Sequence, residues 1–277
     1  MARKTFREML EDRWGRENFV CVGLDPVYEK LPKAVCDPGN MATSIMNFNA
    51  RIVDATKDLV CAYKPNSAFY EALGKLGMYA LRETVAHIRE AAPDVPVILD
   101  AKRGDIGNTN EGYVRAAFDY FEADAITVNP YLGAEALQPF LDKREKGIFV
   151  LCRTSNPGAG ELQDLQIAED PLYLHVARHV ARKWNKWGNC ALVVGATCPD
   201  ELAEVRREVG DLPILIPGIG AQGGELEKTV RAGRDSRRRG MLVNSSRGVL
   251  YASRGEDYAA AARHEVEKLR SAVNACR

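Results

Sequence analysis

Residues 98–109 read Ile98-Leu99-Asp100-Ala101-Lys102-Arg103-Gly104-Asp105-Ile106-Gly107-Asn108-Thr109, an apolar strand that runs directly into alternating charges. In a regular strand, residues two apart project to the same side, so Asp100 and Lys102 are predicted to face together. Burying a carboxylate and an ammonium is costly unless each finds partners. A second carboxylate, Asp105, follows on a loop bounded by glycines. This stretch therefore indicates either a functional site or a salt-bridged strand end at the surface.

Seven other short apolar runs have the same character, and several also end in a charged or polar residue. Because both faces of each run are apolar and helical patterns separate them, they predict parallel βαβ units. Eight is the number of strands that closes a barrel, so we expect an α/β protein, a (β/α)8 TIM barrel with an N-terminal helix. The eight predicted strands are residues 19–26, 59–66, 96–102, 123–130, 147–154, 190–195, 213–218 and 240–244.

The predicted helices follow from apolar residues that recur at helical spacing. Such spacing runs from Phe69 to Ile88, between the second and third strands. After the third strand, Asn108 is the expected N-cap because Glu111 follows three residues later. The other helices are expected at about 5–16, 40–57, 171–187 and 255–273, with a polar loop at 155–170.

The composition is that of an ordinary globular protein, with 277 residues, of which 46% are hydrophobic and 27% charged. No linker or shift in composition divides the chain, so we expect a single barrel domain over residues 1–277. Thirty-eight basic residues balance 38 acidic ones, which argues against nucleic acid or a membrane as a partner. The first residues have no apolar run typical of a secretory signal, and no stretch reaches transmembrane length.

The cysteines and histidines point to neither disulfides nor a metal site. The seven cysteines are scattered without CxxC spacing, which predicts reduced thiols in a cytoplasmic protein. All four histidines fall in predicted helices away from strand ends, so we interpret them as surface or packing residues. They are His87, His175, His179 and His264.

Polar residues follow the ends of most predicted strands. In a TIM barrel the carboxyl ends of the strands meet at one mouth, where catalytic residues are found. The sequence therefore predicts a site at that mouth. Its members are Asp25, Lys64, Asp100, Lys102, Ser155, Gln222 and Arg247.

Two glycine-containing loops after strands seven and eight predict a phosphate site. The first begins at Pro217 and includes Gln222, and the second contains Ser246 and Arg247. Glycines let backbone N–H groups approach phosphate oxygens, and Arg247 can donate a bidentate pair of hydrogen bonds. The alternative is that these are tight barrel turns that bind nothing.

These motifs together resemble the orotidine 5'-phosphate decarboxylase family, particularly its longer bacterial and archaeal form. The resemblance covers all eight strands. It rests on Gly-Leu-Asp25-Pro, Tyr-Lys64-Pro-Asn, Asp100-Ala-Lys102-Arg-Gly-Asp105-Ile, Thr-Ser155-Asn-Pro-Gly, Pro217-Gly-Ile-Gly-Ala-Gln222 and Arg247.

The resemblance implies decarboxylation of orotidine 5'-monophosphate (OMP) to UMP in the de novo pathway, without metal, flavin or Schiff base. Lys102 would stabilise the carbanion at C6 of the pyrimidine and then protonate it. Asp100 would lie near the departing carboxylate and position Lys102. Lys64 and Asp105 would complete the charged network of catalytic residues.

The family's substrate contacts carry over in the same way. Asp25 and Lys64 would bind ribose hydroxyls, and Ser155 would bind the pyrimidine edge. The loops with Pro217, Gln222, Ser246 and Arg247 would hold the phosphate. Asp105 and Thr109 would reach into the site of a second subunit, so the resemblance also implies a homodimer. Taken alone, Asp25 and Ser155 would instead be interpreted as turn residues.

Two alternatives remain open. Mg²⁺-dependent sugar-phosphate lyases and aldolases of the same superfamily, such as 3-keto-gulonate 6-phosphate decarboxylase and hexulose 6-phosphate synthase, share the DxKxxD pattern. They carry a carboxylate where Lys64 stands, and an ammonium there would repel the metal. A non-catalytic nucleotide-binding barrel is the other alternative, and it predicts a damaged charge network.

Overall fold

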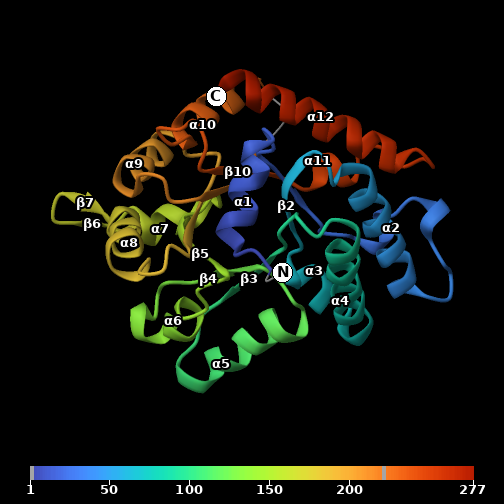
Figure 1. Cartoon of the computed structure of the whole chain (residues 1–277), viewed down its shortest axis with the longest axis horizontal. Coiled ribbons are helices and arrows are strands. Elements are labelled where there is room, and N and C mark those ends of the chain that lie inside the picture. Colours follow the sequence, from blue (N-terminus) through green and yellow to red (C-terminus); the bar gives the residue numbers. More distant parts are fainter. Residues whose placement is uncertain (1–2, 220–222) are drawn as a thin grey trace.

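A parallel sheet of eight strands forms the centre of the molecule, and helices surround it (Figure 1). The computed structural model describes residues 3–219 and 223–277. The strands are β1 (Val20–Gly23), β2 (Val60–Lys64), β3 (Ile98–Arg103), β4 (Ala125–Val128), β5 (Gly147–Arg153), β8 (Cys190–Val194), β9 (Ile214–Pro217) and β10 (Met241–Ser245). All eight coincide with predicted strands.

The strand order is β2-β1-β10-β9-β8-β5-β4-β3, as expected for a barrel. The two outer strands of this order, β2 and β3, meet through the bridges Tyr63–Val97 and Asn66–Asp100. These bridges bring the sheet back onto itself. The predicted (β/α)8 barrel is therefore confirmed, and the carboxyl ends of its strands share one mouth.

The helices lie mainly between consecutive strands and cover the outside of the barrel. Apolar residues on both faces of the strands are buried, which explains why the strands read as continuous apolar runs. The helices are α1 (Phe6–Gly15), α2 (Met41–Thr56), α3 (Ser67–Glu71), α4 (Gly74–Ala91), α5 (Gly107–Arg115), α6 (Gly133–Leu141), α7 (Gly160–Gln163), α8 (Leu172–His179), α9 (Pro199–Val209), α10 (Gly223–Gly233), α11 (Arg247–Leu250) and α12 (Tyr258–Cys276).

Helical spacing from Phe69 to Ile88 indicated one continuous segment, but the structure has two helices there. Gly74, at the junction of α3 and α4, has a φ of 59°, a left-handed conformation that interrupts a helix and that glycine adopts without steric cost. Phe69 and Leu76 consequently lie outside the buried face, with 38% and 50% of their surface exposed.

The predicted N-cap of the helix after β3 was wrong. Helix α5 begins at Gly107, so Asn108 lies inside it and Ile106 precedes it. The buried amide of Asn110 instead ties down this region. It donates to the carbonyls of Asp105 and Ala136 and accepts from the Asp105 N–H.

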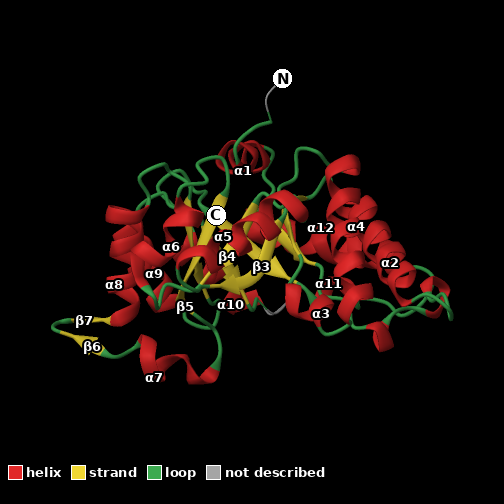
Figure 2. Cartoon of the chain, turned by 90° about the horizontal axis from the view of Figure 1, so that it is seen from below, coloured by secondary structure: helices red, strands yellow, loops and turns green. Residues whose placement is uncertain are grey.

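The segment predicted as a polar loop between β5 and α8 contains short elements. Helix α7 is followed by a two-stranded hairpin, β6 (Gln166–Ile167) and β7 (Asp170–Pro171). Helix α8 then ends at His179 and continues as a π-helical turn to Trp184, three residues short of the predicted end. Figure 2 shows that α7 and the hairpin lie at the end of the barrel opposite to α1.

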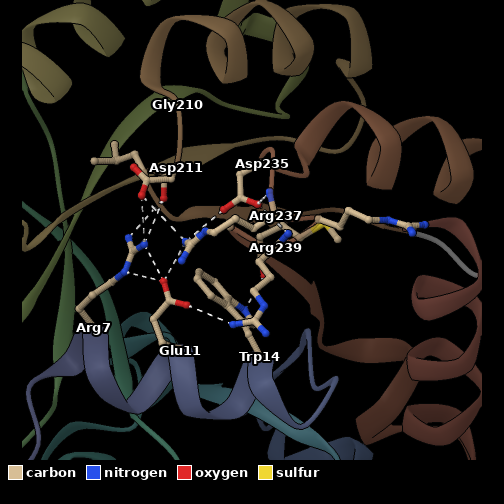
Figure 3. Close-up of polar contacts among 12 residues, drawn as sticks. Arg7, Glu11, Trp14, Gly210, Asp211, Asp235, Arg237 and Arg239 are labelled. Atoms are coloured by element: carbon tan, nitrogen blue, oxygen red, sulfur yellow. Dashed lines mark hydrogen bonds and ion pairs between the residues drawn. The ribbon is translucent and has the colours of Figure 1, made fainter.

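Helix α1 closes the N-terminal end of the barrel. Its buried Trp14 donates from Nε1 to the Met241 carbonyl at the start of β10 (3.0 Å). On its polar side, Glu11 pairs with Arg7 and Arg237, and Arg7 also donates to the carbonyl of Asp211 before β9 (Figure 3). These contacts leave the opposite end of the barrel as the open mouth.

Candidate active site

Three charged side chains form a continuous chain at the C-terminal ends of β2 and β3. The Nζ of Lys64 lies 2.9 Å from Oδ2 of Asp100, and the Nζ of Lys102 lies 2.7 Å from Oδ1 of the same carboxylate. The side chains of Lys64 and Asp100 are 5% and 9% exposed, whereas that of Lys102 is 47% exposed. The carboxylate is thus buried between two ammonium groups, one of which remains open to solvent.

The charges of this chain stabilise one another. Burial by itself lowers the pKa of Lys64, but the carboxylates of Asp100 and Asp25 outweigh that effect and raise it to about 12. Burial also raises the pKa of Asp100, yet Lys64 and Lys102 together hold it well below its ordinary value of 3.8. The buried pair is therefore ionised throughout the neutral pH range.

Asp100 and Lys102 meet for a different reason from the one predicted. Residues Leu99 and Arg103 of β3 pair with Ile126 and Val128 of β4, so β3 has two extra residues at this point. Lys102 adopts a φ of 47°, in the left-handed region that is unfavourable for a side chain with a Cβ. A bulge, not regular strand alternation, brings the two side chains together.

Thr127 of β4 belongs to this group, although no sequence motif pointed to it. Its side chain is buried, and its Oγ1 donates to Oδ1 of Asp100 (2.8 Å) and accepts from the Lys102 N–H (2.9 Å). The available sequence signal was a hydroxyl within the otherwise apolar run of β4.

Asp25, two residues after the end of β1, lies close enough to Lys64 that its carboxylate raises the pKa of that ammonium. It is buried, and its Oδ1 accepts a hydrogen bond from the Asn66 N–H (3.0 Å). The hydroxyl of Tyr70, held in turn by Asn49, donates to the carbonyl of Leu24 (2.8 Å). The backbone that carries Asp25 is thus fixed from the surrounding helices, which explains how a short loop can hold a carboxylate next to Lys64.

A cavity of about 480 Å³ opens at the ends of β1, β9 and β10. Asp25, Ser246 and Arg247 line it, and so does Gly218, the neighbour of Pro217. The structure therefore brings together Asp25, predicted from the sequence to bind ribose, and two of the residues predicted to bind phosphate, Ser246 and Arg247. Gln222, predicted for the same phosphate site, lies outside the described residues.

Close packing at Gly23 shapes this cavity. A Cβ at Gly23 would lie 1.8 Å from Oγ of Ser246, so only glycine allows the start of the β10 loop to approach β1 so closely. Ser246 and Arg247 are placed at the cavity wall as a consequence.

Ser155 follows β5 and packs against the loops after β8 and β9. A Cβ at Gly195 would lie only 2.6 Å from the Cβ of Ser155, and one at Gly218 would lie 3.7 Å from its Oγ. The preceding residue, Thr154, donates its N–H to Gln163 of α7, and its carbonyl accepts from Arg153. Helix α7 thus braces the backbone that carries Ser155, which lies next to Gly218, a residue of the cavity wall.

Asp105 and Thr109 lie apart from this group within the described part of the chain. Oδ1 of Asp105 accepts the Ile106 N–H (2.7 Å), and Thr109 is an exposed residue of α5. Among the contacts described for Asp105 and Thr109, none joins either residue to Lys64, Asp100 or Lys102.

Other parts of the chain offer few alternatives to this site. The four histidines lie in α4, α8 and α12, as predicted. Within residues 3–219 and 223–277, no group of three or more His, Cys, Asp or Glu side chains is arranged to hold a metal ion. Among the described helices, none combines the length and apolar character needed to cross a membrane.

Comparison with known proteins gives consistent matches over nearly the whole chain. A family model described as "Orotidine 5'-phosphate decarboxylase / HUMPS family" matches residues 18–263. The orotidine 5'-phosphate decarboxylase of Cupriavidus taiwanensis is 50% identical over 271 residues, which are 98% of each chain. That of a Roseiflexus species is 51% identical over 273 residues, again 98% of each.

Solved structures give the same result. The OMP decarboxylase of Leishmania donovani is 39% identical and superposes with a TM-score of 0.82. The match covers 96% of this chain and 99% of the Leishmania chain. The UMP synthase of the same organism is also 39% identical and superposes with a TM-score of 0.87. The match covers 99% of this chain and 56% of the UMP synthase chain. The similarity therefore includes the arrangement of the barrel as well as the sequence.

Proposed function

The chain belongs to the orotidine 5'-phosphate decarboxylase family, and from this premise we propose how its side chains convert OMP to UMP and CO2. The activity itself, a step of pyrimidine biosynthesis, follows from 50% identity to a curated decarboxylase over 98% of each chain. One observation carries the proposed mechanism: a half-exposed ammonium, Lys102, is held against a buried carboxylate, Asp100.

Lys102 acts at the reacting carbon. When the bond between C6 and the carboxylate breaks, its electron pair stays on C6 and CO2 leaves. The pyrimidine ring delocalises this charge poorly, so a fixed ammonium beside C6 stabilises the transition state more than the substrate. Lys102 then donates a proton to C6 and is reprotonated from solvent. One proton is consumed for each OMP converted.

Asp100 and Lys64 serve as the frame for Lys102. Lys64 donates to one oxygen of the Asp100 carboxylate and Lys102 donates to the other, which fixes the orientation of the carboxylate. We therefore assign Asp100 first to the positioning of Lys102.

The remaining contacts hold the substrate. Asp25 and Lys64 bind the ribose, and Ser155 binds the pyrimidine edge. The loops that carry Pro217, Gln222, Ser246 and Arg247 bind the phosphate. The cavity supports this division because Asp25 and Arg247 line the same space. Phosphate binding far from C6 supplies energy that can close loops over the ring.

Lys64 favours this mechanism over a Mg²⁺-dependent lyase of the same superfamily. Magnesium prefers oxygen ligands and carboxylates. A Mg²⁺ ion at Asp100 would meet two ammonium groups within 3 Å of that carboxylate. The charge arrangement therefore fits a lysine-based stabilisation of the carbanion.

A homodimer completes the site in this proposal, with Asp105 and Thr109 contributed to the partner's pocket. Supporting this, exposed apolar side chains flank the Asp105 loop and the neighbouring loop after β4. Ile106 is 61% exposed, Tyr131 83% and Leu132 48%. Such a group of apolar residues beside a polar mouth is typical of a protein–protein contact.

We further place the protein in the cytoplasm and treat residues 1–277 as one barrel domain. All seven cysteines are free thiols, including Cys36, Cys198 and Cys276, which are only partly buried. The apolar residues of the helices and strands form one continuous core, from Phe6 to Val273. Both observations support the proposal.

Decarboxylation is tested by following the loss of OMP absorbance with purified protein, with and without EDTA. We expect turnover in both conditions, because the proposed stabilising cation is Lys102. Loss of activity with EDTA and its recovery with Mg²⁺ would instead assign the chain to the metal-dependent branch of the superfamily.

A further inference from the structure

Thr127 occupies a position between the two side chains that the proposed mechanism needs most. It lies in the middle of β4, and only 1% of its surface is exposed. Its Oγ1 is 2.8 Å from Oδ1 of Asp100 and 2.9 Å from the backbone nitrogen of Lys102. A single buried hydroxyl therefore contacts both the carboxylate and the backbone of the residue that carries the ammonium.

The bulge in β3 explains why Lys102 needs this contact. The regular register with β4 includes Leu99 and Arg103 but skips the residues between them. Asp100 N–H is satisfied on the other side, by the Pro65 carbonyl of the β2 end. The Lys102 N–H is satisfied by the Thr127 hydroxyl, which takes the place of a backbone carbonyl in the ladder.

The direction of both hydrogen bonds is determined by chemistry. A backbone N–H can only donate, so the Thr127 oxygen is the acceptor from Lys102. The hydroxyl hydrogen is then free to point at Asp100, and an ionised carboxylate can only accept. A hydrogen bond to a charged acceptor is about twice as strong as one between neutral groups. Thr127 thus orients the carboxylate and stabilises the left-handed backbone of Lys102 together.

We propose that Thr127 is a positioning residue of the decarboxylase site, which holds the Asp100 carboxylate and the strained backbone of Lys102 in their reactive arrangement. The inference rests on the proposed function of Lys102. Thr127 acts through these two residues, so its loss should change the rate of the chemical step and leave substrate binding by the ribose and phosphate residues largely unchanged.

The test replaces Thr127 with valine, which has nearly the same shape but cannot form either hydrogen bond. We expect kcat of Thr127→Val to fall by about ten- to a hundredfold, the range for losing one hydrogen bond to a charged group. The KM for OMP should change by less than about threefold. Thr127→Ser restores the hydroxyl and should keep kcat within about threefold of the wild type.

Thr56→Val is the matched control. Thr56 is also fully buried, and its Oγ1 bonds to the Ile52 carbonyl and the Tyr63 hydroxyl, at the C-terminal end of α2. Its loss should lower the midpoint of thermal unfolding, Tm, without lowering kcat. A purely structural role for Thr127 predicts the same pattern for Thr127→Val.

The inference is overturned if Thr127→Val loses stability as Thr56→Val does but keeps the wild-type kcat. It is also overturned if Thr127→Ser is as slow as Thr127→Val, since the methyl group would then matter and not the hydroxyl. Should Thr127→Val not fold, Thr127→Ala removes the hydroxyl without adding atoms. The same fall in kcat, with little change in KM, is expected for it. A wild-type protein that does not decarboxylate OMP would refute the proposed function instead, which keeps the two failures distinct.

Discussion

At the scale of single residues, the site depends on a buried carboxylate, Asp100, both of whose oxygens accept hydrogen bonds. Asp100 accepts hydrogen bonds from Lys64, Lys102 and Thr127. An unpaired carboxylate at 9% exposure would be strongly destabilising, and each of these donors offsets part of that penalty. The same pairing holds the one open ammonium, Lys102, at a defined position.

Replacement of Lys102 tests its role in the chemical step. Lys102→Ala should lose nearly all turnover, because it removes the ammonium that the proposal places beside C6. Binding of UMP, measured by calorimetry, should be retained, since ribose and phosphate contacts do not involve Lys102. A variant that keeps more than about a hundredth of the wild-type rate would contradict this role.

The buried pair of Lys64 and Asp100 makes a prediction about pH. The lowered pKa of Asp100 contributes stability that is fully present above pH 3.8, the ordinary pKa of the group, and is lost as the pH falls below that value. The raised pKa of Lys64 contributes stability that is present below 10.5 and is lost as the pH rises toward 12. Both contributions should therefore be constant between about pH 5 and 9.

The measurement compares urea unfolding of the wild type with that of the double variant Lys64→Met/Asp100→Leu. The difference in the free energy of unfolding between the two proteins should be constant across that window. At pH 3 the wild type should be less stable relative to the double variant than it is at pH 7. A slope between pH 5 and 9 would show that one member of the pair titrates there.

At the scale of elements, the two ends of the barrel have separate tasks. Helix α1 packs Phe6, Leu10 and Trp14 against the N-terminal end, where they are buried. The site residues lie at the opposite end, on the loops that follow the strands. Contacts at one end should therefore support stability, and contacts at the other end should support catalysis.

Trp14→Ala tests this separation. Trp14 is 1% exposed, stacks on Phe19 and donates to the Met241 carbonyl, so its truncation should reduce the free energy of unfolding by about 3–5 kcal/mol. The kcat/KM for OMP, measured well below Tm, should stay within about twofold of the wild type. Trp187→Ala is the control, because Trp187 is 46% exposed and its loss should change stability by less than about 1 kcal/mol. Equal destabilisation of the two variants, or a large loss of activity in Trp14→Ala, would argue against the separation.

At the scale of the whole molecule, the proposed site needs two chains. Asp105 and Thr109 lie outside the charged chain of their own subunit in the described structure. A two-fold dimer would bring each pair into the partner's pocket by reciprocal contacts. The exposed Ile106 and Tyr131 next to them would then become buried.

Mixed dimers test the shared site. Homodimers of Lys102→Ala and of Asp105→Ala should both be inactive. In a hybrid of the two, one site carries both defects, and the other combines an intact Lys102 with an intact Asp105 from the other chain. Random re-association makes about half of the dimers hybrid, so mixing should restore about a quarter of the wild-type sites. If subunit exchange is shown independently and no activity returns, Asp105 serves its own chain's site and the shared-site proposal fails.

The sequence by itself determined the barrel, because the signals for its strands are local. Each strand reads as an apolar run with a turn or a charge at its end, and all eight were found. The mouth followed from topology, since the carboxyl ends of parallel strands must meet. The sequence alone therefore assigns Asp25, Lys64, Asp100 and Arg247 to one end of the molecule.

Only the tertiary structure decided what depends on contacts between strands. The bulge in β3, the left-handed Lys102 and the hydroxyl of Thr127 arise from the register between β3 and β4, which neither strand specifies alone. The failed Asn108 cap also involves a distant contact, because one of the hydrogen bonds of the Asn110 amide goes to the Ala136 carbonyl, 26 residues away. Local patterns determine which segments become strands and helices, whereas the fit between segments distant in sequence determines where each side chain of the site points.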